Sequence, residues 1–127
     1  AHIRNIAAGA SVGYGGRWTA ASDSRIAILP VGYADGYPWC AEGQAEVLID
    51  GQRVKVIGAV SMDMIALDLS SCTDAKVGDS VVLLGAEGDD EIFAEELALW
   101  GSRLVYEVLT GVGSRVPRRL IDEGVTR

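Results

Sequence analysis

The sequence predicts a mainly β fold: a small Greek-key-type β-barrel with two short helices near the C-terminus. Three observations lead to this prediction. Short β-rich runs are separated by closely spaced glycines, an Asp-Gly turn joins two alternating segments, and the apolar period lengthens from two to about 3.6 in the last third. Many short strands with close turn signals are typical of a small barrel or a sandwich, and we predict the barrel.

The clearest element is a hairpin between Ala45 and Ile57. Its two strands are joined by Asp50-Gly51, a preferred two-residue turn because both positions need positive φ. The turn fixes the register of the strands and places Glu46 opposite Lys55. We therefore expect a favourable cross-strand charge pair between these two side chains.

Further short strands are expected from β-rich runs bounded by glycines. They are 25–29, 57–60, 64–69 and 80–84. In the run 64–69, Ile65, Leu67 and Leu69 alternate with Met64, Ala66 and Asp68. That alternation predicts a strand that is buried on one face.

The C-terminal third predicts helices. Acidic residues 89–91 precede a segment with Phe93, Leu97 and Trp100 at helical spacing, and Gly101 ends it. A second short helix is expected to contain Leu104, Val105, Val108 and Leu109. The predicted architecture is therefore β first, with two short helices near the end.

Length and composition indicate one folded domain, residues 1–127. Apolar residues make up 49% of the chain, which excludes a disordered protein. The net charge of −7 and the pI of about 4.5 argue against a nucleic-acid partner, and the clustered Arg115, Arg118 and Arg119 are too few to reverse this. No apolar run approaches the ~20 residues that span a bilayer, and no signal peptide is apparent, so no membrane partner is expected.

The residue types present exclude most kinds of catalytic site. The one histidine, His2, lies at an N-terminus that we expect to be frayed, so no Ser/His or Cys/His nucleophile pair is predicted. Cys40 and Cys72 lack the spacing of a zinc site, and we predict no metal. Both are expected to be thiols in a reducing, cytoplasmic compartment. Any chemistry would use one or two side chains in a site completed elsewhere.

Tyr14 is the first candidate because glycines surround it in the run 11–16. Such glycines suit a tight turn, and they also allow close approach of another backbone or a cofactor. A tyrosine can act as a general acid or base when its neighbours lower its pKa from about 10 toward neutral. Taken alone, this motif favours a structural turn.

The other candidates also have structural explanations when each is taken alone. Tyr33 lies in a dense turn in which Asp35 can cap the loop backbone and Gly36 can take positive φ. Met62 would ordinarily fill a core, and Tyr106 would lie on a helix surface. For Asp35, and likewise for Asp63 and Arg115, a structural role is the better prediction.

The combination of motifs is much more specific than any one of them. In chain order they are SVGYGG, VGYADGYP, IDG, GAVSMDMIALDL, GDSVVLLG and VYEVLTGVGSRVP, from about Gly9 to Pro117. This ordered set strongly resembles the C-terminal domain of alanine racemases. The resemblance covers nearly the whole chain and reverses the assessment of Tyr14.

The resemblance implies a part of an enzyme that interconverts L- and D-alanine. In that family an N-terminal α/β barrel holds pyridoxal phosphate on a lysine, and a β domain follows it; this chain resembles the β domain alone. The family forms head-to-tail homodimers in which the β domain of one subunit leans over the barrel of the other. The implied partners are the barrel of the same protein, the barrel of a second subunit, and alanine, and the isolated domain is expected to be inactive.

The functional residues of the family fall on four positions of this sequence. Tyr14 matches the tyrosine that acts as acid/base toward the L-alanine face in the partner's active site, opposite the cofactor lysine. Met62 matches the methionine whose backbone N–H helps hold the substrate carboxylate. Tyr33 matches the tyrosine that narrows the substrate entrance, and Tyr106 matches the one that hydrogen-bonds the cofactor phosphate.

Two positions depart from the family pattern. Trp39 and Ala59 stand where family members usually carry arginines that line the substrate corridor. This leaves open a racemase for another small amino acid. A β-barrel module used only for assembly and a racemase-like regulator with a decayed site are further alternatives. Retention of all four matched side chains favours the enzyme.

Overall fold

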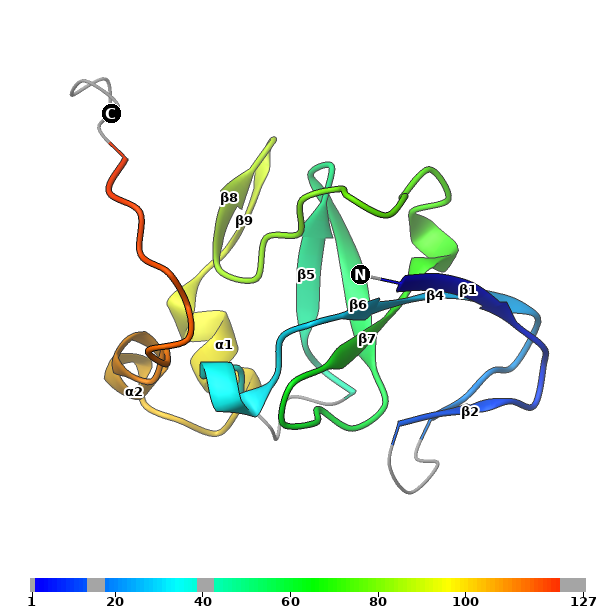
Figure 1. Cartoon of the computed structure of the whole chain (residues 1–127), viewed down its shortest axis with the longest axis horizontal. Helices are drawn as coiled ribbons and strands as arrows, with labels where there is room; N and C mark the ends of the chain where they lie inside the picture. The colour runs from blue at the N-terminus through cyan, green and yellow to red at the C-terminus, as the bar shows by residue number, and fades with distance from the viewer. Residues whose placement is uncertain (1, 14–17, 39–42, 122–127) are drawn as a thin grey trace.

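A five-stranded antiparallel sheet forms the centre of the molecule (Figure 1). The structure, a computed structural model, describes residues 2–13, 18–38 and 43–121. In spatial order the sheet contains β1 (His2–Ile6), β4 (Ser24–Leu29), β7 (Ile65–Asp68), β6 (Gln52–Ile57) and β5 (Glu46–Ile49). The two-stranded ribbons are β2 (Ser11–Val12) with β3 (Trp18–Thr19), and β8 (Gly85–Glu87) with β9 (Asp90–Ile92). The helices are α1 (Ala94–Trp100) and α2 (Val105–Thr110), with the 3-10 turns η2 (Tyr33–Asp35) and η4 (Leu69–Ser71).

The mainly β fold with two short C-terminal helices is confirmed. In Figure 1 the helix pair lies on one side of the central sheet and β2 on the other. The strand order leaves β1 and β5 at the two edges, so the described strands form open sheets. The closed Greek-key barrel stays a prediction.

The hairpin of β5 and β6 has the predicted turn and register. Asp50 and Gly51 both adopt positive φ, of 51° and 75°, and Glu46 lies opposite Lys55. The predicted ion pair is wrong, however, because the Glu46 carboxylate binds the Arg53 guanidinium at 3.3 Å. Arg53 lies two residues from Lys55 on the same face of β6, and its longer, forked side chain also reaches other carboxylates.

Two of the predicted strands are not formed. The run 57–60 is interrupted because β6 ends at Ile57 and Gly58 turns the chain with a φ of +70°. In the run 80–84, Val82 makes only an isolated bridge to Leu48 of β5. The apolar residues of the run 80–84 suggested a strand, but this segment pairs with the sheet through Val82 alone.

The N-terminal segment is ordered by the sheet. His2 was expected in a frayed end, but it begins β1 and lies opposite Ile28 of β4. The burial pattern of β1 is mixed, with Ile3 and Ile6 facing apolar clusters. Pairing with a buried neighbouring strand, which no local signal reveals, explains this correction.

Helix α1 ends as predicted at Gly101, but a short strand precedes it. Residues 89–91 precede the helix as predicted, but Asp90 and Glu91 belong to β9, which the sequence did not predict. Phe93 is the N-cap residue of α1, and its N–H donates to the Glu96 carboxylate at 2.9 Å. Glu96 therefore satisfies a backbone donor that the start of the helix would leave free.

The main core lies between the sheet and α1. Its fully buried side chains include Val47, Leu48, Val54, Leu67 and Ile92. Ile65, Leu67 and Leu69 are buried in this core as predicted, and Met64 is 49% exposed. The predicted exposure of the other face is wrong at Ala66, which is only 7% exposed and packs in a second cluster, so β7 is covered on both faces. A smaller cluster of Val12, Ile26, Ile57 and Ala66 fixes the β2–β3 ribbon against the sheet.

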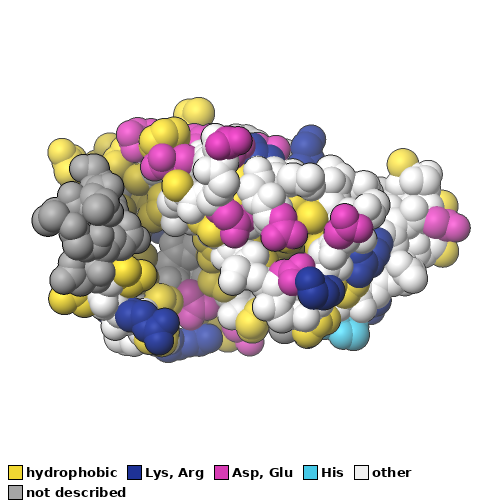
Figure 2. Space-filling view, turned by 90° about the horizontal axis from the view of Figure 1, so that it is seen from above, with side chains coloured by type: hydrophobic (Ala, Val, Ile, Leu, Met, Phe, Trp, Pro, Cys, Tyr) yellow, Lys and Arg dark blue, Asp and Glu magenta, His cyan; other side chains and the backbone are white. Residues whose placement is uncertain are grey.

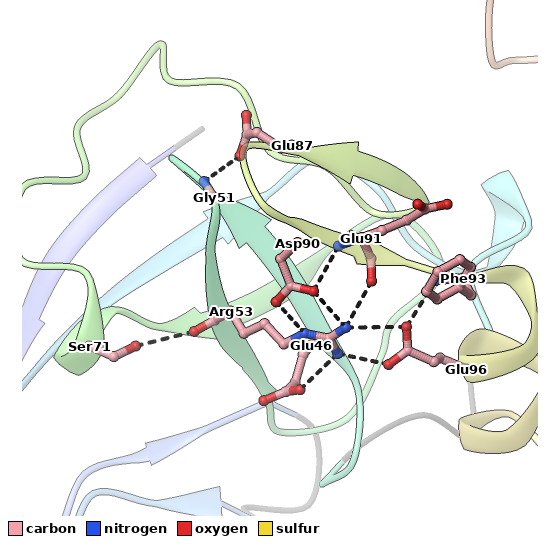
Figure 3. A network of polar contacts seen from close by, with 9 residues as sticks. All are labelled: Glu46, Gly51, Arg53, Ser71, Glu87, Asp90, Glu91, Phe93 and Glu96. Atoms are coloured by element: carbon pink, nitrogen blue, oxygen red, sulfur yellow. Dashed lines mark hydrogen bonds and ion pairs between the residues drawn. The ribbon is translucent and has the colours of Figure 1, made fainter. Parts of the chain in front are cut away.

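One guanidinium ties β5, β6, β9 and α1 together (Figure 3). Arg53 of β6 donates to Asp90 through Nε (2.9 Å), and its Nη1 donates to Glu96 (2.8 Å) and Glu46 (3.3 Å). Its Nη2 donates to the Glu91 carbonyl at 2.8 Å. These charge-assisted bonds use the whole donor fork, so the hairpin, the β8–β9 ribbon and the first turn of α1 share one anchor.

The same anchor makes stability depend on pH. Hydrogen bonding to Arg53 holds the pKa of the Asp90 and Glu96 carboxyls below their ordinary values. Because these folded-state pKa values are depressed, the ionised carboxylates stabilise the fold above their unfolded pKa values of about 4. That stabilisation is lost as the pH falls through the folded-state values.

We predict that Arg53→Gln lowers the melting temperature at about pH 7 by at least about 4 °C. The reason is that three carboxylates lose their shared cation and repel one another. The difference from wild type should shrink as the pH falls below about 4, toward the depressed pKa values of the Asp90 and Glu96 carboxyls. Thermal unfolding followed by circular dichroism measures it, with Arg119→Gln at an exposed arginine as the control. Equal losses in both variants, or a difference that does not depend on pH, would contradict the prediction.

Candidate active site

Loop 58–64, between β6 and β7, is the centre of the candidate site. A Cβ on Gly58 would lie 2.7 Å from the Val12 carbonyl oxygen, and a Cβ on Gly13 would lie 2.9 Å from the Ala59 nitrogen. Both glycines also have positive φ. Only glycine permits this approach, which brings the end of β2 against the loop.

The turn Gly32–Gly36 packs on the other part of the same loop. The Tyr33 N–H donates to the Ser61 carbonyl at 3.0 Å, and the Ala34 N–H donates to the Met62 carbonyl at 2.9 Å. A side chain at Gly32 would collide with the Ser61 and Met62 backbone. These contacts place Tyr33 next to Met62 through backbone bonds that do not depend on the side chains.

The tip of loop 58–64 presents a free donor. Ser61 closes a turn with Met64: its N–H and its hydroxyl donate to the Met64 carbonyl at 3.0 and 2.9 Å, and its Oγ accepts the Met64 N–H at 3.1 Å. Among the described residues, the Met62 N–H donates no hydrogen bond. The side chain of Met62 is 55% exposed. The turn therefore carries an exposed residue whose backbone N–H has no acceptor among the described residues and could donate to an anionic group.

The end of helix α2 contacts the opposite side of the Gly32–Gly36 turn. A Cβ at Gly36, whose φ is +104°, would collide with the Gly111 carbonyl. The Gly113 N–H donates to the Asp35 carbonyl at 3.0 Å. Tyr106, on α2 itself, is 79% exposed. One turn thus joins the loop that carries Met62 to the helix that carries Tyr106.

The two tyrosines of the turn segment have different environments. Tyr33 is 47% exposed at the surface, whereas Tyr37 is 5% exposed in the main core. Burial raises the pKa of the Tyr37 phenol, so this group remains neutral. Tyr37 is therefore a packing residue, and Tyr33 is the tyrosine of this segment that a ligand could reach.

The structure brings three of the four predicted site residues to connected segments. Tyr33 and Met62 are neighbours through backbone bonds, and Tyr106 lies on the helix whose end contacts the same turn. Tyr14 and Trp39 lie outside the described residues. Gly13, which precedes Tyr14 in the chain, is described and packs against Ala59. The predicted roles of all four residues stay predictions.

A groove of about 610 Å³ opens beside the end of β2. Gly13, Ala59 and Ser61 line it, together with Arg4 of β1. Ala59 therefore lies where a longer side chain would project into the groove. An arginine at this position would add positive charge next to Gly13.

Neither lysine of the chain belongs to these loops. Lys55 is exposed on β6, and Lys76 pairs with Asp79 at 3.1 Å with its side chain 78% exposed. In the part of the chain that the structure describes, no group of His, Cys, Asp or Glu side chains could hold a metal ion. The loops offer a tyrosine and a backbone donor, which fits a contribution to a cofactor site but not a complete one.

Asp35 has a larger role than the sequence suggested. Its predicted capping of the loop is confirmed, because Oδ2 accepts the Gly32 N–H at 3.1 Å. Sequence reasoning missed its ion pair with Arg115 Nε at 3.2 Å. The spacing of the two residues along the chain gives no signal for this pair, which depends on where α2 ends.

One face of the molecule agrees with the acidic composition. Figure 2 shows Asp and Glu side chains spread over the face in view, with fewer Lys and Arg side chains among them. Within the described residues, no helix has the length and apolar character needed to cross a membrane. An acidic face does not attract the phosphates of a nucleic acid.

Comparison with known proteins finds one family. A family model described as the C-terminal domain of alanine racemase matches residues 1–120. The alanine racemase of Thermodesulfovibrio yellowstonii is 42% identical to this chain, over 95% of the chain and 33% of that protein. The chain thus spans about a third of the length of this relative.

Solved structures agree in fold. The alanine racemase of Bacillus anthracis, determined with bound L-Ala-P, is 35% identical, with a TM-score of 0.90 over 97% of this chain and 31% of that one. The alanine racemase of Bartonella henselae, with covalently bound pyridoxal phosphate, is 31% identical, with a TM-score of 0.83 over 94% of this chain and 32% of that one. From the match over residues 1–120 and these similarities, the chain belongs to the family of alanine racemase C-terminal domains.

Proposed function

We propose that this chain works as the β domain of a pyridoxal phosphate-dependent racemase that interconverts L- and D-alanine, and that it is inactive alone. The observation that carries the proposal is the meeting of three segments, the end of β2, the Gly32–Gly36 turn and the Met62 loop, in a chain matched to this family over residues 1–120. The chain spans about a third of its relatives, which leaves room for an N-terminal barrel in the parent protein.

Tyr14 is proposed as the acid/base toward the L-alanine face. Pyridoxal phosphate, when bound to the substrate amine, withdraws electrons and makes the Cα–H more acidic. A phenol oxygen on one face of that carbon can then remove or return the proton, while a lysine of the barrel serves the other face. Gly13 supports this proposal, because its contact with Ala59 fixes the chain directly before Tyr14 against the Met62 loop.

The other three residues would bind and orient. The Met62 N–H, for which no acceptor is found among the described residues, would donate a hydrogen bond to the substrate carboxylate, a contact strengthened by the negative charge. Tyr33, half-exposed beside it, would narrow the substrate entrance. Tyr106 is exposed on α2 and would donate its phenol O–H to the cofactor phosphate.

The partners are proposed from the same family. The barrel of the same protein and that of a second subunit would cover the exposed site residues in a homodimer, in the cytoplasm. The chain carries only Lys55 and Lys76, and neither belongs to the site loops, which supports a cofactor held by the barrel. An assembly module without catalysis would not need an exposed tyrosine beside a backbone donor that has no acceptor among the described residues.

A racemase for another small amino acid is the second candidate. It is favoured by Trp39 and Ala59, which replace two usual arginines of the substrate corridor. Ala59 lines the groove beside Gly13, so alanine in place of the usual arginine removes positive charge from this groove. The experiment on these two positions below separates the two substrates.

We predict that Tyr14→Phe in the full-length protein reduces turnover by on the order of 10²-fold or more, because one acid/base hydroxyl is lost. Exchange of the α-hydrogen with deuterated solvent should fall much more for L-alanine than for D-alanine, since the lysine still serves the D face. Proton NMR of both enantiomers measures this exchange. Equal losses for both enantiomers would refute the assignment to one face, and turnover at the wild-type rate would make Tyr14 a structural residue.

We predict that this chain alone forms no single-site adduct with pyridoxal phosphate. Lys55 is exposed on a strand and Lys76 is held by Asp79, and neither faces a pocket of the site loops. Borohydride trapping followed by mass spectrometry of the intact chain and its peptides tests this. A stoichiometric adduct on either lysine would contradict the placement of the cofactor in another domain.

We predict that restoring arginine at Trp39 and Ala59 in the full-length protein raises kcat/KM for alanine with little change in kcat. Positive charge near the entrance steers an anionic carboxylate and so acts on capture, with a steeper salt dependence. A panel of small amino acids at two ionic strengths provides the measurement. If the double variant instead loses activity on another amino acid that wild type prefers, the second candidate is correct. No change in kcat/KM or in the ranking would mean that neither position contributes to specificity.

A further inference from the structure

Asp35 is buried, with 8% of its surface exposed. No other charged residue in the described part of the chain is buried. Both carboxylate oxygens of Asp35 and its main-chain oxygen interact with its own turn or with another segment. Oδ2 accepts the Gly32 N–H (3.1 Å), Oδ1 pairs with Arg115 Nε (3.2 Å), and the main-chain oxygen accepts the Gly113 N–H (3.0 Å). A carboxylate that only capped its loop would need the first of these contacts alone.

The contacts of Asp35 lie between the two segments that carry candidate site residues. On one side of its turn, the Tyr33 and Ala34 N–H groups bind the backbone of Ser61 and Met62. On the other side, segment 111–116 follows α2, the helix of Tyr106, and supplies the Gly113 and Arg115 contacts. The turn therefore sets the relative position of Tyr33, the Met62 N–H and α2.

The pair with Arg115 is asymmetric in its exposure. The Asp35 side chain is 7% exposed and the Arg115 side chain 60%. An exposed pair contributes little, but a buried carboxylate that loses its cation remains as an uncompensated charge. Loss of the pair should therefore destabilise mainly the turn that carries Tyr33, because the buried carboxylate belongs to that turn.

A second carboxylate in this chain shows what a purely local cap is like. Asp79 accepts the Lys76 N–H at 3.0 Å and pairs with Lys76 Nζ at 3.1 Å, both within one turn. Like Asp35, Asp79 accepts a backbone N–H and forms an ion pair. Both of its partners, however, are groups of Lys76 in its own turn. Asp79→Asn is therefore a matched control for Asp35→Asn.

We propose that Asp35, through Arg115, is a positioning residue that holds Tyr33 and the Met62 loop in register with the end of α2. The inference rests on the proposed racemase function for its kinetic consequence, but not for its structural one. Loss of the pair loosens the turn against segment 111–116, which then keeps the Gly113 N–H bond to the Asp35 main-chain oxygen. Substrate capture is then impaired more than proton transfer, because the bonds of Asp35 reach Gly32, Gly113 and Arg115. Gly13, the neighbour of Tyr14, instead packs on Ala59.

The test uses the full-length protein with Asp35→Asn, Arg115→Gln, Arg115→Lys and the control Asp79→Asn. Hydrogen–deuterium exchange should become faster in peptides covering both 32–37 and 111–116 for Asp35→Asn and Arg115→Gln. The kcat/KM for alanine should fall about tenfold or more, mainly through KM, since small misplacements of binding groups are costly. Arg115→Lys should recover part of both effects because the cation returns, and Asp79→Asn should behave as wild type in both measurements.

Several outcomes would overturn the inference. Faster exchange confined to 32–37 would reduce Asp35 to a local cap. Unchanged kinetics with faster exchange in both segments would refute the proposed effect of Asp35 on substrate capture. If Asp35→Asn fails to fold, Arg115→Gln decides, because it alters the exposed end of the pair. If the wild-type protein does not racemise alanine, the proposed function fails, while the exchange pattern still decides whether Asp35 links the two segments.

Discussion

The Arg53 guanidinium is the interaction on which the arrangement of this domain depends. It binds carboxylates of β5, β9 and α1 at once, so three elements that do not pair as strands with one another are held on β6 (Figure 3). Helix α1 packs on α2, and the end of α2 contacts the turn of Tyr33. A chain of contacts therefore runs from one charged cluster to the candidate site. Because each carboxylate alone would be a weak surface partner, the strength lies in the network.

Close backbone approach is the second constraint. Gly13 against Ala59, and Gly32 against Ser61, are contacts where any side chain would collide with main-chain atoms. Backbone atoms cannot move away as the end of a flexible side chain can, so these positions accept only glycine. Contacts between backbone atoms therefore set the spacing of the segments that form the candidate site. The side chains of these segments are not needed for those contacts and can bind a ligand.

Local chemistry could be predicted from the sequence, and long-range partners could not. The Asp50-Gly51 turn and the cap by Asp35 depend on neighbours in the chain, and both were predicted. The strand that begins at His2 and the partners of Arg53 depend on tertiary contacts, and these were missed or assigned to the wrong cation. In the site, the ordered motifs suggested the candidate residues, but the pairing of Asp35 with Arg115 required the position of α2.

The exposure of the candidate residues has a physical meaning of its own. A self-contained ligand pocket buries most of its ligand and encloses its polar groups. Here Met62 is 55%, Tyr33 47% and Tyr106 79% exposed, although the backbone of each is held by hydrogen bonds. Fixed backbone with open side chains is the arrangement expected of half of a site, because the ordering is complete before a second surface arrives. The entropy cost of ordering the loops is then part of folding this domain, and a second protein surface that binds here would need to order little more than the side chains themselves.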